Sequence, residues 1–131
     1  MHDLHYHEVV ERLLDVIPEI RPSFDEEAKK WDSRRPHPDI VFGTLFSNLI
    51  AEKVRCQLNG FDETKEIVKR AFSLLEELSA SSDFKTRCLA EVSVLESLLG
   101  DEGGVQLYIP FMGLRTRKLA EELVHRWHIE R

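Results

Sequence analysis

Histidines are the residues of this sequence that most directly suggest chemistry, and five of the six lie in two groups near its ends. His125 and His128 are three residues apart, so a helix would place both imidazoles on one face, as some metal sites do. The other group consists of His2, His5 and His7. Neither group is accompanied by a cysteine pair or a Glu-x-x-His motif that would complete a ligand set. The spacing therefore indicates solvated side chains, and we expect no metal and no cofactor.

A second candidate for chemistry is the pair Arg87 and Glu91, which interrupts an otherwise apolar helical face one turn apart. A catalytic carboxylate needs a second carboxylate, a metal or a nucleophile nearby, and the spacing identifies none. Two interpretations remain open: a partly buried ion pair, or the edge of a surface where another chain docks. Because the sequence also lacks a Ser-His-Asp order and a glycine-rich phosphate loop, we expect no enzymatic activity.

Charge argues against a nucleic-acid partner. The 131 residues carry a net charge of −6, whereas nucleic-acid binding calls for a basic face. The basic cluster Arg115–Lys118 could meet a phosphate at the start of a helix, but a solvated face is the commoner role of such a cluster. The acidic excess is concentrated over residues 1–33, with nine acidic and four basic side chains. That field would attract a basic partner.

Seven residues are candidates for binding such a partner. Exposed acidic side chains would steer association, and aromatic side chains in or beside loops would anchor the complex. The candidate steering charges are Asp25, Glu26, Glu27 and Asp32. The candidate anchors are Trp31, Tyr108 and Phe111. The alternative for the aromatic residues is that they form a lid over the core.

The sequence also bears on location and on the cysteines. No apolar run approaches the roughly 20 residues of a membrane span, and the N-terminus lacks the pattern of a secretory signal. We therefore expect a cytoplasmic protein that does not bind membranes. Cys56 and Cys88 fall at apolar helical positions, which is typical of reduced thiols used as small core residues.

Apolar spacing predicts an all-α fold: one domain over residues 1–131, built as a bundle of five to six helices. Asp83–Gly100 has the widest apolar arc, including Phe84 and Val92, and is expected to be the central helix. Gly43 is expected to mark a close helix crossing, and Asp3 and Asp62 to cap helices. The other predicted helices begin near residues 3, 24, 38, 62 and 113. Val105–Phe111 is expected to be an extended loop, since Pro110 disfavours a helix there.

Several segments together resemble a known family. They are Glu11–Leu14, Pro18–Ile20, Pro38–Phe42, Cys88–Glu96 and Met112–Arg117. From about residue 8 to 124 the chain resembles small all-helical bacterial proteins of largely unknown function, some of which look like immunity proteins of polymorphic toxin systems. It departs from their pattern at Cys88, where a polar residue is usual.

The resemblance implies a non-catalytic protein-binding module, an immunity protein that neutralises a cognate toxin domain. The partner would be a basic secreted toxin domain, which suits an acidic inhibitor. The competing hypothesis is a helical adaptor or regulatory subunit, as a monomer or a homodimer. A neighbouring gene for a large secreted protein would favour the first hypothesis, and an operon of metabolic genes the second.

Overall fold

The computed structural model describes residues 3–130, and it is 80% helical with no strand in that range. The all-α prediction is confirmed, but the described residues form seven continuous helices rather than five or six. The first four are made of η1 (Tyr6–Glu8) with α1 (Val9–Val16), η2 (Pro18–Ile20) with α2 (Arg21–Ala28), α3 (Pro38–Ile40) with η3 (Val41–Phe46) and α4 (Ser47–Leu58), and η4 (Asp62–Thr64) with α5 (Lys65–Ser79). The last three are α6 (Phe84–Cys88) with η5 (Leu89–Leu95) and α7 (Glu96–Gly100), α8 (Gly104–Tyr108) with η6 (Ile109–Phe111), and α9 (Leu114–Glu130).

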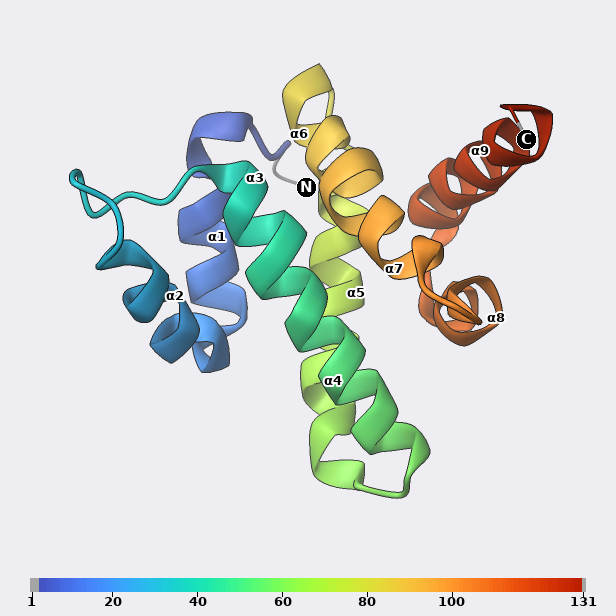
Figure 1. Cartoon of the computed structure of the whole chain (residues 1–131), viewed down its shortest axis with the longest axis horizontal. Helices are drawn as coiled ribbons and strands as arrows, with labels where there is room; N and C mark the ends of the chain where they lie inside the picture. The colour runs from blue at the N-terminus through green and yellow to red at the C-terminus, as the bar shows by residue number, and fades with distance from the viewer. Residues whose placement is uncertain (1–2, 131) are drawn as a thin grey trace.

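The helices are arranged around α5 and the continuous helix of residues 84–100 (Figure 1). Along the longest axis of the molecule, α1 and α2 lie at one end and α8 and α9 at the other. Helix α5 packs against α1, α4, η5 and α9, so it links both ends. Its buried apolar face consists of Val68, Ala71, Phe72, Leu74, Leu75 and Leu78. None of the described helices has the length and apolar character needed to span a bilayer.

Two segments with π-helical hydrogen bonding, η3 and η5, pack directly against each other. At their crossing a Cβ atom on Gly43 would lie 3.4 Å from the carbonyl oxygen of Ser93, and Ser97 Oγ donates to the Gly43 carbonyl at 3.3 Å. The predicted role of Gly43 at a close crossing is therefore confirmed.

The π-helical stretch changes which residues of the 84–100 helix are buried. Leu89 and Ala90, at the edge of the predicted polar arc, are 1% and 0% exposed, whereas Val92 is 52% exposed. A π-helix closes each ring of hydrogen bonds over one more residue than an α-helix, so the 100° spacing used for the prediction does not hold across it. Phe84 is also exposed, at 69%, because it occupies the first turn of the helix. The burial predicted for Phe84 and Val92 is wrong.

The segment predicted as an extended loop is the additional helix, α8 with η6. Gly103 begins it in the left-handed conformation (φ 75°), which glycine adopts without strain. A Cβ on Gly104 would lie only 2.1 Å from the carbonyl oxygen of Leu98, so this residue must be glycine for α8 to fold back on α7. Pro110 does not prevent the helix because it occupies an early position of η6, where no N–H donor is needed.

The first described residues are held by contacts with the α5–α6 loop as well as by a local cap, in which the N–H of His5 donates to the Glu8 carboxylate at 2.9 Å. Asp3, predicted to cap the first helix, instead accepts hydrogen bonds from Ser82, through the backbone N–H at 3.0 Å and through the hydroxyl. The N–H of Tyr6 donates to the Asp83 carboxylate at 2.8 Å. The cap predicted at Asp62 is also wrong, because Asp62 lies inside the η4 turn.

Candidate functional site

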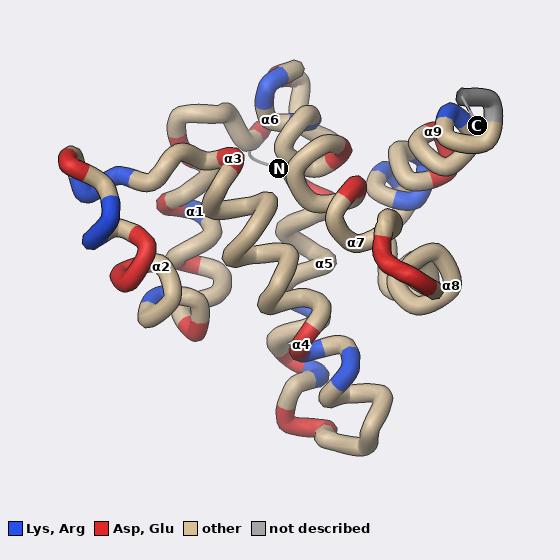
Figure 2. The backbone as a smooth tube through the Cα atoms, in the orientation of Figure 1, with Lys and Arg blue, Asp and Glu red and all other residues tan. Residues whose placement is uncertain are grey.

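Five of the seven predicted partner-binding residues, the four acidic ones and Trp31, lie on α2 or the turn after it, and two of the four negative charges are balanced locally. Glu26 forms an ion pair with Lys29 at 3.1 Å, and Glu27 lies 3.6 Å from the ammonium of Lys30. Figure 2 shows acidic and basic positions close together around α2 and the following turn. Asp25 and Asp32 are exposed. These last two carboxylates are therefore the better candidates for long-range steering.

The predicted aromatic anchors are not brought together. Trp31 is partly buried and donates through Nε1 to the Glu27 carboxylate at 3.0 Å. Phe111 belongs to η6, beside α8 at the opposite end of the molecule from α2 (Figure 1). Tyr108 is 0% exposed and belongs to the hydrophobic core, so it cannot anchor a partner at the surface. Tyr108 is the last residue of α8, and the helix turns its ring toward the core. The sequence predicted an extended loop here and so did not predict this burial.

Arg87 and Glu91 do not bind each other, so the ion-pair interpretation is wrong, and the other interpretation, the edge of a docking surface, stays a prediction. Arg87 donates to the Ser81 carbonyl at 2.8 Å and lies over the Phe84 ring. Glu91 instead accepts from Arg126 of α9. Both residues tie the 84–100 helix to its neighbours in this fold.

The other chemical candidates remain dispersed. His125 and His128 are exposed on α9, and His2 lies outside the described residues. Cys56 and Cys88 are free thiols, each partly exposed. Across the residues that the structure describes, no three His, Cys, Asp or Glu side chains converge as a metal-binding group.

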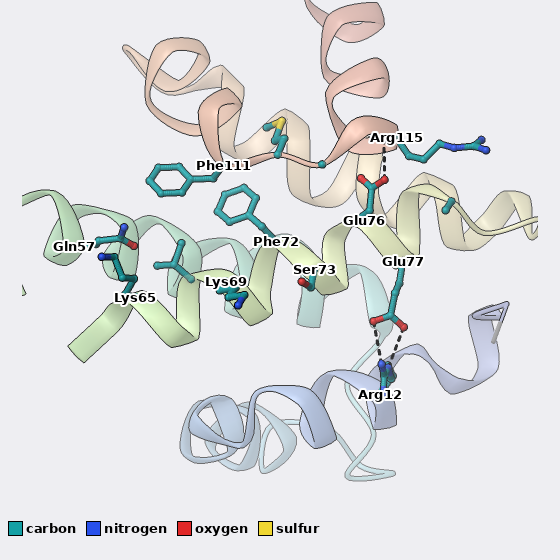
Figure 3. Close-up of a pocket in the computed structure, with 14 residues that line it drawn as sticks. Arg12, Gln57, Lys65, Lys69, Phe72, Ser73, Glu76, Glu77, Phe111 and Arg115 are labelled. Atoms are coloured by element: carbon teal, nitrogen blue, oxygen red, sulfur yellow. Dashed lines mark hydrogen bonds and ion pairs between the residues drawn. The ribbon is translucent and has the colours of Figure 1, made fainter. Parts of the chain in front are cut away.

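A hollow with a volume of about 1140 Å³ runs along the outer side of α5, between α1 and the η6–α9 segment (Figure 3). We call it the α5 groove. It is lined by Arg12, Gln57, Lys65, Val68, Lys69, Phe72, Ser73, Glu76, Glu77, Ala80, Phe111, Met112, Gly113 and Arg115.

The floor of the α5 groove is apolar. Phe72 of α5 and Phe111 of η6 stack with ring centroids 5.5 Å apart and planes inclined by 24°. Val68 lies one turn before Phe72 on α5, and Met112 follows Phe111. Phe111 is partly exposed, so this aromatic pair presents a ring edge to an incoming apolar side chain.

Both carboxylates of the α5 groove are occupied by groups of the chain itself. Glu77 binds Arg12 through two hydrogen bonds of 3.0 and 3.1 Å, which join α5 to α1. Glu76 accepts the backbone N–H groups of Arg115 and Thr116, both at 2.9 Å, and the Thr116 hydroxyl at 2.9 Å. Glu76 thus caps the N-terminus of α9 from another helix.

The protonation of Glu76 follows from this cap. Burial acts to raise the pKa of Glu76, but the hydrogen bonds from Thr116 and Arg115 outweigh it, and the pKa lies below its ordinary value of 4.5. The carboxylate therefore stays ionised at neutral pH. For the basic cluster Arg115–Lys118 the sequence favoured a solvated face over a phosphate site, and the start of its helix already holds this internal anion.

Lys65 and Lys69 are the cations of the α5 groove that are left for a partner. They are exposed, one turn apart on α5, and form no ion pair within the described part of the chain. The Arg115 side chain points away from the two phenyl rings (Figure 3). The sequence carried a signal for this surface, since Lys65, Lys69 and Ser73 recur every four residues opposite the buried face of α5. It gave no sign of the neighbouring walls.

Comparisons with known proteins identify a family but no activity. No curated protein and no solved structure matches this chain. One family profile, described as "Domain of unknown function (DUF7674)", matches residues 10–128 and so covers most of the chain. The match agrees with the expected resemblance to proteins of largely unknown function, and it leaves the immunity role a proposal. The chain belongs to the DUF7674 family.

Proposed function

We propose that this chain is a non-catalytic protein-binding module, and that it serves as an immunity protein which neutralises a cognate bacterial toxin domain. The observation that carries the proposal is the α5 groove, with its stacked Phe72–Phe111 floor beside exposed lysines. Protein interfaces commonly have an apolar centre that contains aromatic side chains and a rim of charged residues. Phe111 is the one predicted anchor that lies in this groove.

The acidic residues of α2 and of the turn after it have a separate role in this proposal. Asp25 and Asp32 are exposed and act at long range, so they raise the rate of encounter with a basic toxin surface without joining the groove. The two surfaces should therefore differ kinetically. Groove residues set the dissociation rate, and α2 charges set the association rate and its dependence on salt.

The test is co-expression of the chain with the protein encoded next to it, followed by growth measurement and co-purification. We expect the chain to rescue growth and to co-purify with that protein. Ser73→Arg, which places bulk at an exposed position in the groove, should abolish both effects. Asn48→Arg introduces the same side chain at an exposed position of α4 outside the groove, and should retain both.

The kinetic part is tested with the purified pair. Changing Asp25, Glu26 and Glu27 to lysine together should slow association about tenfold at low salt and leave dissociation nearly unchanged. Trp31→Ala, in the turn after α2, should instead speed dissociation. If growth is not rescued and the two proteins do not co-purify, the immunity role fails and the adaptor hypothesis replaces it.

A further inference from the structure

Resting on the proposed binding function, we infer that the occupant of the α5 groove is an acidic amphipathic helix of the partner protein. Its apolar side chains pack on Phe72 and Phe111, and its carboxylates pair with Lys65 and Lys69. The sequence predicted a basic partner, but a purely basic segment would be repelled by the lysines of this groove. The part of the partner that enters the groove should therefore be acidic.

Charge complementarity is the first argument. The chain is acidic overall, yet the groove is lined by four basic and two acidic residues. Both acids are satisfied internally, Glu77 by Arg12 and Glu76 by the start of α9. Of the four basic residues, Arg12 is bound to Glu77, and the Arg115 side chain points away from the two phenyl rings (Figure 3). The two lysines remain beside the apolar floor, and they stand one turn apart, an arrangement in which like charges repel. Carboxylates of a partner would relieve that repulsion.

The position of the lysines adds to the attraction. Lys65 and Lys69 lie in the first turns of α5, whose N-terminus carries the positive end of the helix dipole. Glu66, next to Lys65, lies 3.9 Å from Arg70 on another side of the helix. Among the α5 residues that line the groove, none before Glu76 is acidic. The positive charge of the two lysines is therefore not neutralised by a carboxylate of the groove lining.

The shape of the groove favours a helix over a small ligand. Its lining follows α5 from Lys65 to Glu77, a length of about 18 Å at 1.5 Å per residue. Helix α1 forms one wall and the η6–α9 segment the other (Figure 3). A helix lying along α5 would present residues every three or four positions to Val68 and Phe72, which is how amphipathic helices bind in grooves.

The inference is tested with two labelled 15-residue helical peptides of leucine and alanine that differ only in charge. One carries glutamates one turn apart beside its leucine stripe, and the other carries lysines there. Fluorescence anisotropy with the full chain at low salt should show the acidic peptide binding about tenfold tighter or more. The double variant Lys65→Glu/Lys69→Glu should reverse this preference.

The matched control is Arg35→Glu/Lys118→Glu, which changes the net charge equally at two exposed positions outside the groove. It should leave the affinity for the acidic peptide within about twofold, so that an effect of total charge is excluded. Circular dichroism of each variant checks that the helices are intact. Equal affinity for the two peptides, or an unchanged preference in the groove variant, would overturn the inference.

Two further outcomes separate this inference from the proposed function. If oleate displaces the acidic peptide from the groove and binds more tightly, the groove takes a small anionic amphiphile, and the inference is overturned. If a partner protein is lost with Ser73→Arg but retained with Lys65→Glu/Lys69→Glu, the binding function stands and the acidic helix does not. Loss of the partner with both changes, and retention with the control, would support the inference.

Discussion

The carboxylate of Glu76, on α5, accepts the backbone N–H of Thr116 at 2.9 Å and thereby caps α9, forty residues further along the chain. Helix N-termini leave several N–H groups without partners, and these are usually satisfied by a side chain of the adjacent residue. Here the cap comes from a different helix. The same contact therefore starts α9 and fixes its angle against α5.

Removing this cap should destabilise the protein. Glu76→Ala is expected to lower the free energy of unfolding by about 1–2 kcal/mol, because two N–H groups and a buried hydroxyl lose their acceptor. Glu77→Ala is the control: it removes the neighbouring carboxylate, whose ion pair with Arg12 lies at the surface and should contribute less than about 1 kcal/mol. Urea denaturation measures both, and an equal or larger loss for Glu77→Ala would contradict the role given to Glu76.

The stabilisation by Glu76 should depend on pH. Its pKa in the folded protein is lowered from 4.5, so folding favours the ionised form, and the contribution is complete above the unfolded pKa. It is lost as the pH falls through the folded pKa. The difference in unfolding free energy between the wild type and Glu76→Gln should therefore be largest near neutral pH and shrink below about pH 4. A difference that stays constant from neutral to acid pH would show that ionisation is not what stabilises the contact.

Gly113 should be coupled to Glu76. A Cβ at residue 113 would lie 2.7 Å from Glu76 Oε1, so Gly113→Ala must displace the carboxylate from α9. We expect a loss of about 1 kcal/mol in the wild type and almost none in a Glu76→Ala background, a non-additivity that a double-mutant cycle measures. Equal losses in the two backgrounds would mean that the alanine acts on the backbone instead.

Within the π-helical residues 89–95, alanine substitutions of Leu95 and Val92 should differ in their effect on stability. Leu95 is 0% exposed, and Leu95→Ala should cost about 2–5 kcal/mol. Val92 is 52% exposed, and Val92→Ala should cost less than about 1 kcal/mol. Thermal or urea unfolding of the two variants tests this assignment directly. Comparable losses would indicate that the helix keeps regular α-helical phase and buries Val92.

Alanine substitutions at Gly104 and Gly100 should have opposite effects on stability. A Cβ on Gly104 would meet the backbone oxygen of Leu98 at 2.1 Å, and backbone cannot move aside as a side chain can. Gly104→Ala should therefore destabilise by about 3 kcal/mol or more. A Cβ on Gly100 meets nothing within 4 Å, so Gly100→Ala should be neutral or stabilise by less than about 1 kcal/mol. Melting temperatures distinguish the two, and a tolerated Gly104→Ala would argue against the sharp turn from α7 to α8.

The sequence by itself determined the features that depend on neighbouring residues. Apolar spacing predicted the 84–100 helix nearly to its ends, because burial of one helix face repeats every three or four residues. It also placed Gly43 at a close crossing, since a glycine inside a long helix is costly without such a reason.

Only the tertiary structure decided which groups meet from distant parts of the chain. The cap between Glu76 and Thr116 and the ion pair of Glu91 with Arg126 join separate helices, and the hydrogen bonds that Ser82 donates to Asp3 join the residues before the first helix to the α5–α6 loop. Sequence spacing is silent about them because they depend on how the helices pack. The α5 groove arises in the same way: Lys65 and Lys69 are a local pattern, but η6 and α1 supply its walls through the packing of the whole bundle.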